Sequence, residues 1–254
     1  MQCLQELQAT DFHKIGRHYF IITKNRECLR LNQAKQIVAR KTISGEDYFK
    51  FKLLCHLAAT MAGIKPITMM RFKPLRQESS QCVSCIQHWR EIKKYFQEEQ
   101  SLEVALMERS QHGEEALIFY HRNACRQLLA HPRVKSFLLD QGIGYGEETV
   151  NKPDLFIHLC LKKYRDDGSL PVAMGLLMGI PLKDVKGYLD GNEVPTITSG
   201  WRIYGTPHHS LLLANLYRRL RQYAVMAFFK HSFADIVNRL GRSRLIERVG
   251  LLAR

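Results

Sequence analysis

The chain has 254 residues, enough to bury one substantial core, and its 45% hydrophobic and 24% charged residues exclude a disordered or fibrous protein. Seven scattered cysteines, an odd number, exclude the dense paired framework of a small disulfide-rich secreted domain. The formal net charge of +14 favours nucleic acid, anionic lipid headgroups, a phosphate-bearing ligand or an acidic protein as partner, and equally fits a basic surface in water.

The chain shows no pattern of export or membrane insertion. Its first residues lack the basic, apolar and small-residue succession of a secretory signal. The longest apolar run, residues 170–182, is shorter than the roughly 20 residues that span a bilayer. We therefore expect a cytoplasmic protein without a membrane span.

The first half of the chain predicts helices with two short strands. Residues 1–45 are expected to form an N-terminal extension. A helix is predicted after Ser44, which can cap its first turn, and it ends at Gly63. Residues 67–72 and 116–120 predict strands, the second leading directly into a helix over 123–130, and the Glu-, Lys- and Gln-rich segment 81–111 predicts one or two amphipathic helices.

The second half is predicted to be mostly helical. Helices are expected near 154–164, 171–178 and 182–189, followed by a third short strand at 201–204 between two glycines. From Pro207 onward a long helix is expected. Its apolar stripe packs on the core, and Arg218 and Arg221 face away from that stripe; the stripe consists of Leu212, Leu216, Leu220, Tyr223 and Ala227.

These elements predict an α/β fold that is mainly helical, with a small sheet of about three or four short strands. Residues 46–230 are expected to form the central domain. Residues 231–254 are expected to form a basic helical tail.

Four blocks of the chain carry a family resemblance. In chain order they are Cys55 to Pro66 (CHLAATMAGIKP), Leu117 to Arg122 (LIFYHR), Leu176 to Tyr188 (LLMGIPLKDVKGY) and Gly200 to Gly205 (GWRIYG). They resemble blocks that occur in the same order in a bacterial family of domains of unknown function, DUF3793. The resemblance spans about residues 53–230 and implies kinship without implying an activity. One departure is that the chain reads Leu-Pro-Val-Ala-Met-Gly at 170–175, where the family usually has Phe-Pro-His-Glu-Ile-Gly.

The candidate ligand-binding residues lie in these blocks, at expected ends of strands or starts of helices, where open α/β sheets form binding clefts. They are Lys65, Tyr120, Arg122, Trp201, Arg202 and Tyr204. We expect Lys65, Arg122 and the strand at 201–204 to border one pocket. Lys65 could bind a phosphate or carboxylate, or form a Schiff base if desolvated. The simpler alternative is that Lys65 complements the dipole of the preceding helix.

A metal site is a second candidate. Cys82, Cys85 and His88 lie within seven residues and offer donors that suit zinc. The sequence supplies no obvious fourth ligand, so surface cysteines on a helix are the alternative.

Three functions remain open at this point. The first is a binding or accessory protein for an anionic small molecule, a cofactor or an acidic protein. The second is an enzyme that uses Lys65 and the tyrosines in a cleft. The third is nucleic-acid binding through the basic C-terminal helices, where residues 233–242 resemble part of a helix-turn-helix. The residues identify no particular cofactor and leave open whether the protein is an enzyme.

Overall fold

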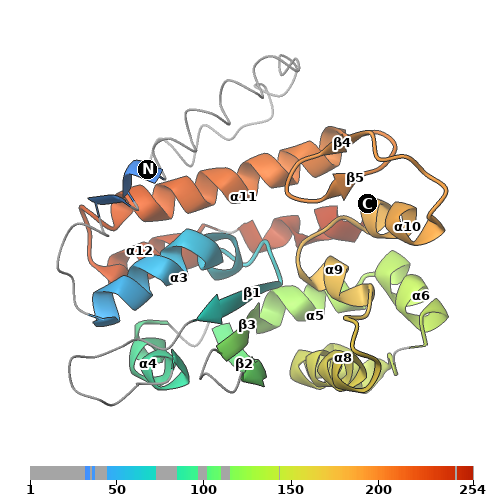
Figure 1. Ribbon diagram of the computed structural model, residues 1–254, viewed down its shortest axis with the longest axis horizontal. Helices are drawn as coiled ribbons and strands as arrows, with labels where there is room; N and C mark the ends of the chain where they lie inside the picture. The colour runs from blue at the N-terminus through green and yellow to red at the C-terminus, as the bar shows by residue number, and fades with distance from the viewer. Residues whose placement is uncertain are drawn as a thin grey trace.

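A computed structural model describes residues 32–34, 36–37, 45–72, 85–96, 102–109, 115–142, 144–243 and 245–253 (Figure 1). Its α-helices are α3 (Gly45–Met61), α4 (Cys85–Ile92), α5 (Arg122–Ala130), α6 (Pro132–Asp140), α7 (Glu147–Asn151), α8 (Pro153–Asp167), α9 (Ala173–Leu177), α10 (Leu182–Asp190), α11 (His208–Ala227) and α12 (Phe233–Gly241). Two 3₁₀ helices are η2 (Lys93–Tyr95) and η4 (Leu245–Ala253). The strands are β1 (Ile67–Phe72), β2 (Leu102–Arg109), β3 (Glu115–His121), β4 (Ile197–Thr198) and β5 (Arg202–Ile203). The mainly helical fold with a small sheet confirms the predicted fold class.

Local sequence signals place several of these boundaries. The His121 side chain caps α5 by accepting from the amide of Ala124, and Ser232 caps α12 through the amide of Asp235. Proline occupies the start of α6 and of α8, where its missing amide donor costs nothing. Gly168 ends α8 in the left-handed conformation, with φ of 72°.

The main sheet has three antiparallel strands in the order β1-β3-β2. The predicted strands at 67–72 and 116–120 are confirmed as β1 and β3, which pair from Ile67 opposite Tyr120 to Phe72 opposite Glu115. Because the sheet is antiparallel, the expectation of a cleft at the ends of parallel strands does not apply to it.

The prediction of helix across residues 81–111 was wrong for its second half. Helix α4 occupies 85–92, but residues 102–109 form strand β2, which pairs with β3 along its length with a register shift between Leu106 and Glu108. Glu, Leu, Ala and Met favour a helix in isolation. Here the hydrogen bonds to β3 and the burial of Leu102 and Met107 outweigh that local preference.

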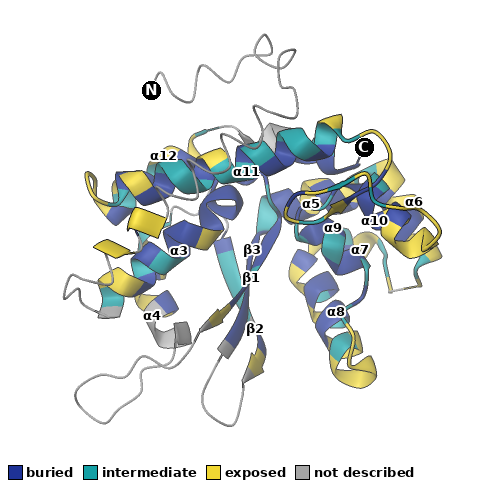
Figure 2. Ribbon diagram, turned by 45° about the horizontal axis from the view of Figure 1, so that its top comes forward, coloured by how far each residue is buried: buried dark blue, intermediate teal, exposed yellow. Residues whose placement is uncertain are grey.

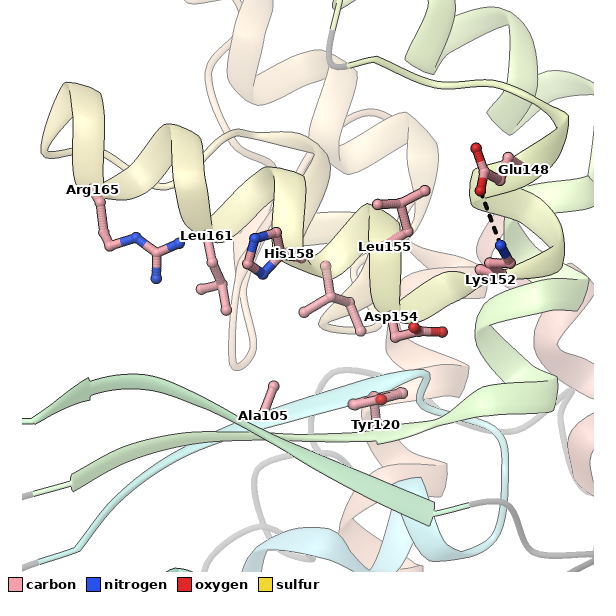
Figure 3. Close-up of a pocket in the computed structure, with 10 residues that line it drawn as sticks. Ala105, Tyr120, Glu148, Lys152, Asp154, Leu155, His158, Leu161 and Arg165 are labelled. Carbon is pink, nitrogen blue, oxygen red and sulfur yellow. Dashed lines mark hydrogen bonds and ion pairs between the residues drawn. The ribbon is translucent and has the colours of Figure 1, made fainter.

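Helices cover both faces of this sheet (Figure 2). On one face Trp89 of α4 packs edge-on against Phe119, and Thr60 of α3 hydrogen-bonds to Thr68 at 2.8 Å. On the other face Tyr120 points toward α8 (Figure 3). The sheet is therefore a central layer between the α3–α4 side and the α8 side.

Helix α11 packs along α3 and closes the core above the sheet (Figure 1). Leu216 and Leu220, from the predicted stripe, are buried, while Leu212 is only partly buried. The segment expected as a C-terminal tail also contributes to the core. Its buried side chains in this cluster are Phe233, Ile236, Val237, Leu240, Val249, Leu252 and Ala253.

Candidate functional site

A cavity of about 560 Å³ lies between α3 and α11, beside the turn that joins α9 to α10. The edge strand β1 contributes Thr68 and Met69 to its wall. Its polar and aromatic lining residues include Lys65, Trp201, Tyr217, Arg218 and Arg221. We call it the α3–α11 cavity.

Lys65 enters this cavity from the segment between α3 and β1. The chain leaves α3 at Gly63, whose φ of 70° favours glycine, and the amides of Ile64 and Lys65 both donate to the carbonyl of Ala59. Burial lowers the pKa of Lys65 to about 8. Among the described residues no carboxylate pairs with its ammonium, in contrast to Lys50, Lys93 and Lys183.

Helix α11 supplies two guanidinium groups. Ala214, Tyr217, Arg218 and Arg221 all line the cavity, and their spacing of three and four residues places them on one side of the helix. Arg218 and Arg221 were expected to face away from the packed stripe, and in the structure this other side of the helix is partly buried at the cavity. The Nε atom of Arg221 is buried and has no hydrogen-bond partner within the described part of the chain.

Trp201 is held at the cavity by a buried carboxylate. Its indole N–H donates to Asp184 Oδ2 at 2.8 Å, and Ser210 Oγ donates to the same oxygen at 2.6 Å. Asp184 Oδ1 accepts from the amide of Tyr204 at 3.0 Å and from Lys183 Nζ at 2.6 Å. The four bonds join the first turn of α10, the residues on either side of strand β5 and the first turn of α11, so Trp201 has a fixed orientation.

The turn before α10 forms another wall. Gly179 has φ of 84°, and a Cβ atom built there would lie 2.6 Å from Tyr217 Oη and 3.0 Å from Lys65 Cγ. Tyr217 donates its hydroxyl to the carbonyl of Gly179 at 3.0 Å, and its ring lies 6.3 Å from that of Trp201. The turn therefore lies against both Lys65 and Tyr217, and it accepts no side chain larger than hydrogen at Gly179.

Tyr120 belongs to a second cavity, also of about 560 Å³, between the sheet and α8 (Figure 3). Figure 3 shows Tyr120 and Ala105 directed from the strands toward His158 and Asp154 of α8. Burial, helped by the negative charge of Asp154, raises the pKa of Tyr120 to about 12. The tyrosine is therefore a neutral hydroxyl at physiological pH, on a different surface from Lys65.

The remaining candidates border neither cavity. Arg122 lies 3.8 Å from Glu103 in an ion pair, and Arg202 is exposed on β5. Tyr204 is buried, and its ring lies so close to Gly187 that a Cβ there would be 2.5 Å from it. The expectation of one pocket bordered by Lys65, Arg122 and the strand at 201–204 thus holds only for Lys65 and Trp201. Tyr204 has a packing role.

The structure does not describe the side chains of the three candidate metal ligands. Cys82 lies outside the described residues, and Cys85 and His88 lie in α4 with side chains that are not described. Across the described ranges no cluster of three metal-binding side chains occurs. In the same ranges, no helix combines the length and apolar character that crossing a membrane requires.

The model of one protein family, described as a protein of unknown function (DUF3793), matches residues 53–237. The chain belongs to this family. The match covers most of the chain and confirms the kinship that the four blocks indicated. No curated protein and no solved structure matches the chain.

Three of the four family-like blocks meet at the α3–α11 cavity. Lys65 comes from the first block, Gly179 adjoins the cavity from the third, and Trp201 comes from the fourth. Sequence reasoning missed Tyr217, Arg218 and Arg221 as site residues. The signal that could have identified them is their spacing with Ala214, which marks a second helical stripe beside the leucines.

Proposed function

We propose that the DUF3793 protein binds a small anionic molecule, carrying a phosphate or carboxylate group, in the α3–α11 cavity. The observation that supports this most is the charge of the cavity wall. Lys65, Arg218 and Arg221 line it, and none of the described residues that line it is acidic. Cations gathered in a recess with low-dielectric walls attract anions more strongly than the same cations spread over a surface.

The two arginines are the natural anchors for the anion. An arginine stays charged at all physiological pH values and presents planar donors that match the oxygens of carboxylate or phosphate. The buried Nε of Arg221 is a donor that needs an acceptor, and a ligand oxygen would supply it. Lys65, with a pKa of about 8, adds a charge that is present below that pH and is lost above it.

Trp201 gives the cavity a rigid aromatic wall. Because its indole is fixed by Asp184, binding a flat ligand against it would cost little side-chain entropy. An arginine beside an aromatic ring is a combination that also stacks on planar groups. The favoured ligand is therefore a small anion with a planar or unsaturated part.

The nucleic-acid alternative has less support from the fold. Helix α12, which resembled part of a helix-turn-helix, directs Phe233, Ile236 and Leu240 into the core and is followed by the 3₁₀ helix η4. Recognition of a groove needs a second exposed helix at that place. The recessed cations of the α3–α11 cavity suit a small molecule better than a long polyanion.

The test is binding of defined anions to the full-length protein by calorimetry and thermal shift. We expect phosphate, pyrophosphate or citrate to raise the melting temperature. Arg221→Gln should weaken that binding by about tenfold or more, since it removes a charge-assisted hydrogen bond worth roughly 1.5–3 kcal/mol.

The matched control is Arg219→Gln. Arg219 lies on the same helix but is exposed, so its loss should change the affinity less than about twofold. Equal effects of the two substitutions would show that only the general positive charge attracts the anion. The proposal is refuted if no anion binds the wild-type protein.

A further inference from the structure

Lys65 differs from the other partly buried lysines in how it is held. Its backbone is fixed on both sides, since its own amide donates to Ala59 and the carbonyl of Pro66 accepts from the amide of His121 at 2.8 Å. Its aliphatic stem lies against Gly179. A partly buried lysine with a structural role is commonly paired with a carboxylate, as Lys183 is with Asp184 at 2.6 Å. Lys65 instead places its amine in the cavity with no such partner among the described residues.

An amine in this setting is a nucleophile. Only the uncharged amine has a lone pair that can attack carbon, and an ordinary lysine is almost fully protonated at neutral pH. Desolvation lowers the pKa of Lys65 to about 8, so roughly a tenth of its amine is uncharged at pH 7, far more than for an ordinary lysine. Arg221 keeps its charge, and its buried Nε offers a donor to an anionic group.

We propose that Lys65 forms an imine with an anionic aldehyde or ketone, such as a 2-oxo acid or a phosphorylated aldehyde, bound in the α3–α11 cavity. This inference rests on the proposed function and names its ligand class. It is carried by the cavity position of the unpaired Lys65 amine, fixed between α3 and Gly179, together with Arg218 and Arg221 on the same wall.

The step needs no oxidant or reductant. The Lys65 Nζ lone pair attacks the carbonyl carbon and forms a C–N bond, while the C=O π electrons move to oxygen, which takes up a proton. In the resulting carbinolamine the nitrogen has lost one proton; the hydroxyl takes up a second proton from solvent and leaves as water while the nitrogen lone pair forms the C=N bond. The nitrogen then returns its last proton to solvent. The net change is amine plus carbonyl compound to imine plus water.

The experiment traps the imine in the full-length protein. Glyoxylate and pyridoxal phosphate serve as anionic aldehyde probes, borohydride reduces the adduct, and peptide mapping by mass spectrometry locates it. We expect Lys65 to be labelled about tenfold or more faster than Lys183 and the exposed Lys162, with a rate that rises with pH through about 8. Lys65→Arg should abolish the fast phase while keeping a positive charge at the position.

Arg221→Gln connects the labelling to anion recognition. It should slow labelling by glyoxylate about tenfold more than it slows labelling by acetaldehyde, a neutral aldehyde, whereas Arg219→Gln should leave the ratio of the two rates unchanged. Labelling of Lys65 no faster than of Lys162 would overturn the inference. If Lys65 is labelled slowly but Arg221→Gln still weakens anion binding, the proposed function stands and only the imine is refuted. Fast labelling of Lys65 by glyoxylate and by acetaldehyde that Arg221→Gln does not slow would also overturn the inference, because the carbonyl compound would then not be selected as an anion.

Discussion

At the scale of single residues, the most informative side chain is Lys65. Burying an amine without an ionic partner costs folding free energy, because the folded protein disfavours the charged form that water stabilises. The structure therefore retains at this cavity a group that destabilises it. Functional sites commonly contain such groups, whose perturbed pKa is useful in chemistry.

Lys65→Met should raise the free energy of unfolding at pH 7 by about 1–3 kcal/mol. The folded pKa of about 8 lies below the ordinary value of 10.5, so the unfolded chain binds more protons between these values and wild-type stability gains from Lys65 as pH rises across them. The advantage of the methionine variant should accordingly be complete below pH 8 and shrink toward pH 10.5. Urea unfolding of the wild-type protein and the variant at pH 7 and at pH 10 measures the stability difference at each pH.

The control for this prediction is Lys162→Met at an exposed position of α8, which should change stability by less than about 0.5 kcal/mol. A loss of stability in Lys65→Met at pH 7 would contradict the assignment of an unpaired buried amine.

At the scale of elements, α11 both packs the core and lines the site. One stripe of the helix buries Leu216 and Leu220, and the adjacent stripe lines the cavity through Tyr217, Arg218 and Arg221. The position of the two arginines relative to Lys65 therefore depends on how α11 packs against α3.

Leu216→Ala should lower the free energy of unfolding by about 2–4 kcal/mol, because it removes a buried side chain and leaves a cavity among packed neighbours. The same truncation at Leu212, which is only partly buried, should cost clearly less. Denaturant titration of the two variants gives the comparison. Equal losses would contradict the orientation of the helix.

At the scale of the whole molecule, His121 joins several parts of the fold. Its amide donates to the carbonyl of Pro66, which precedes β1. His121 is also the last residue of β3, and its ring caps α5. Burial lowers the pKa of His121 to about 4. Protonation would remove the lone pair with which the ring nitrogen accepts from the amide of Ala124. Because His121 links the start of β1, the end of β3 and α5, we expect its protonation to lower the stability of the whole fold.

The wild-type protein should lose up to roughly 3 kcal/mol of stability from His121 alone as pH falls from about 6.5 to about 4. Stability falls as pH falls because the unfolded chain, in which the histidine has the higher pKa, binds the proton before the folded protein does. His121→Asn, which keeps a capping side chain, should remove this part of the acid slope. His158→Asn serves as the control for loss of a surface histidine, and melting temperatures across this pH range measure the effect. An unchanged slope in His121→Asn would refute the assignment.

The sequence by itself determined the features that depend on local pattern. The apolar runs at 67–72 and 116–120 predicted β1 and β3, because buried strands are short and bounded by turn or cap residues. Ser44 and Gly63 predicted the two ends of a helix, close to the observed bounds Gly45–Met61 of α3. The four ordered blocks also indicated the family, and the match over residues 53–237 confirms it.

Only the tertiary structure decided which residues form β2 and which residues meet at the cavity. Residues 102–109 carry a helical composition, and pairing with β3 made them a strand. Lys65, Trp201 and Arg221 are far apart in sequence, and nothing local indicates that the Asp184 hydrogen bonds and the packing of α11 on α3 bring them to one cavity. Local propensity acts over a few residues, whereas a site is assembled by contacts whose partners the sequence pattern does not specify.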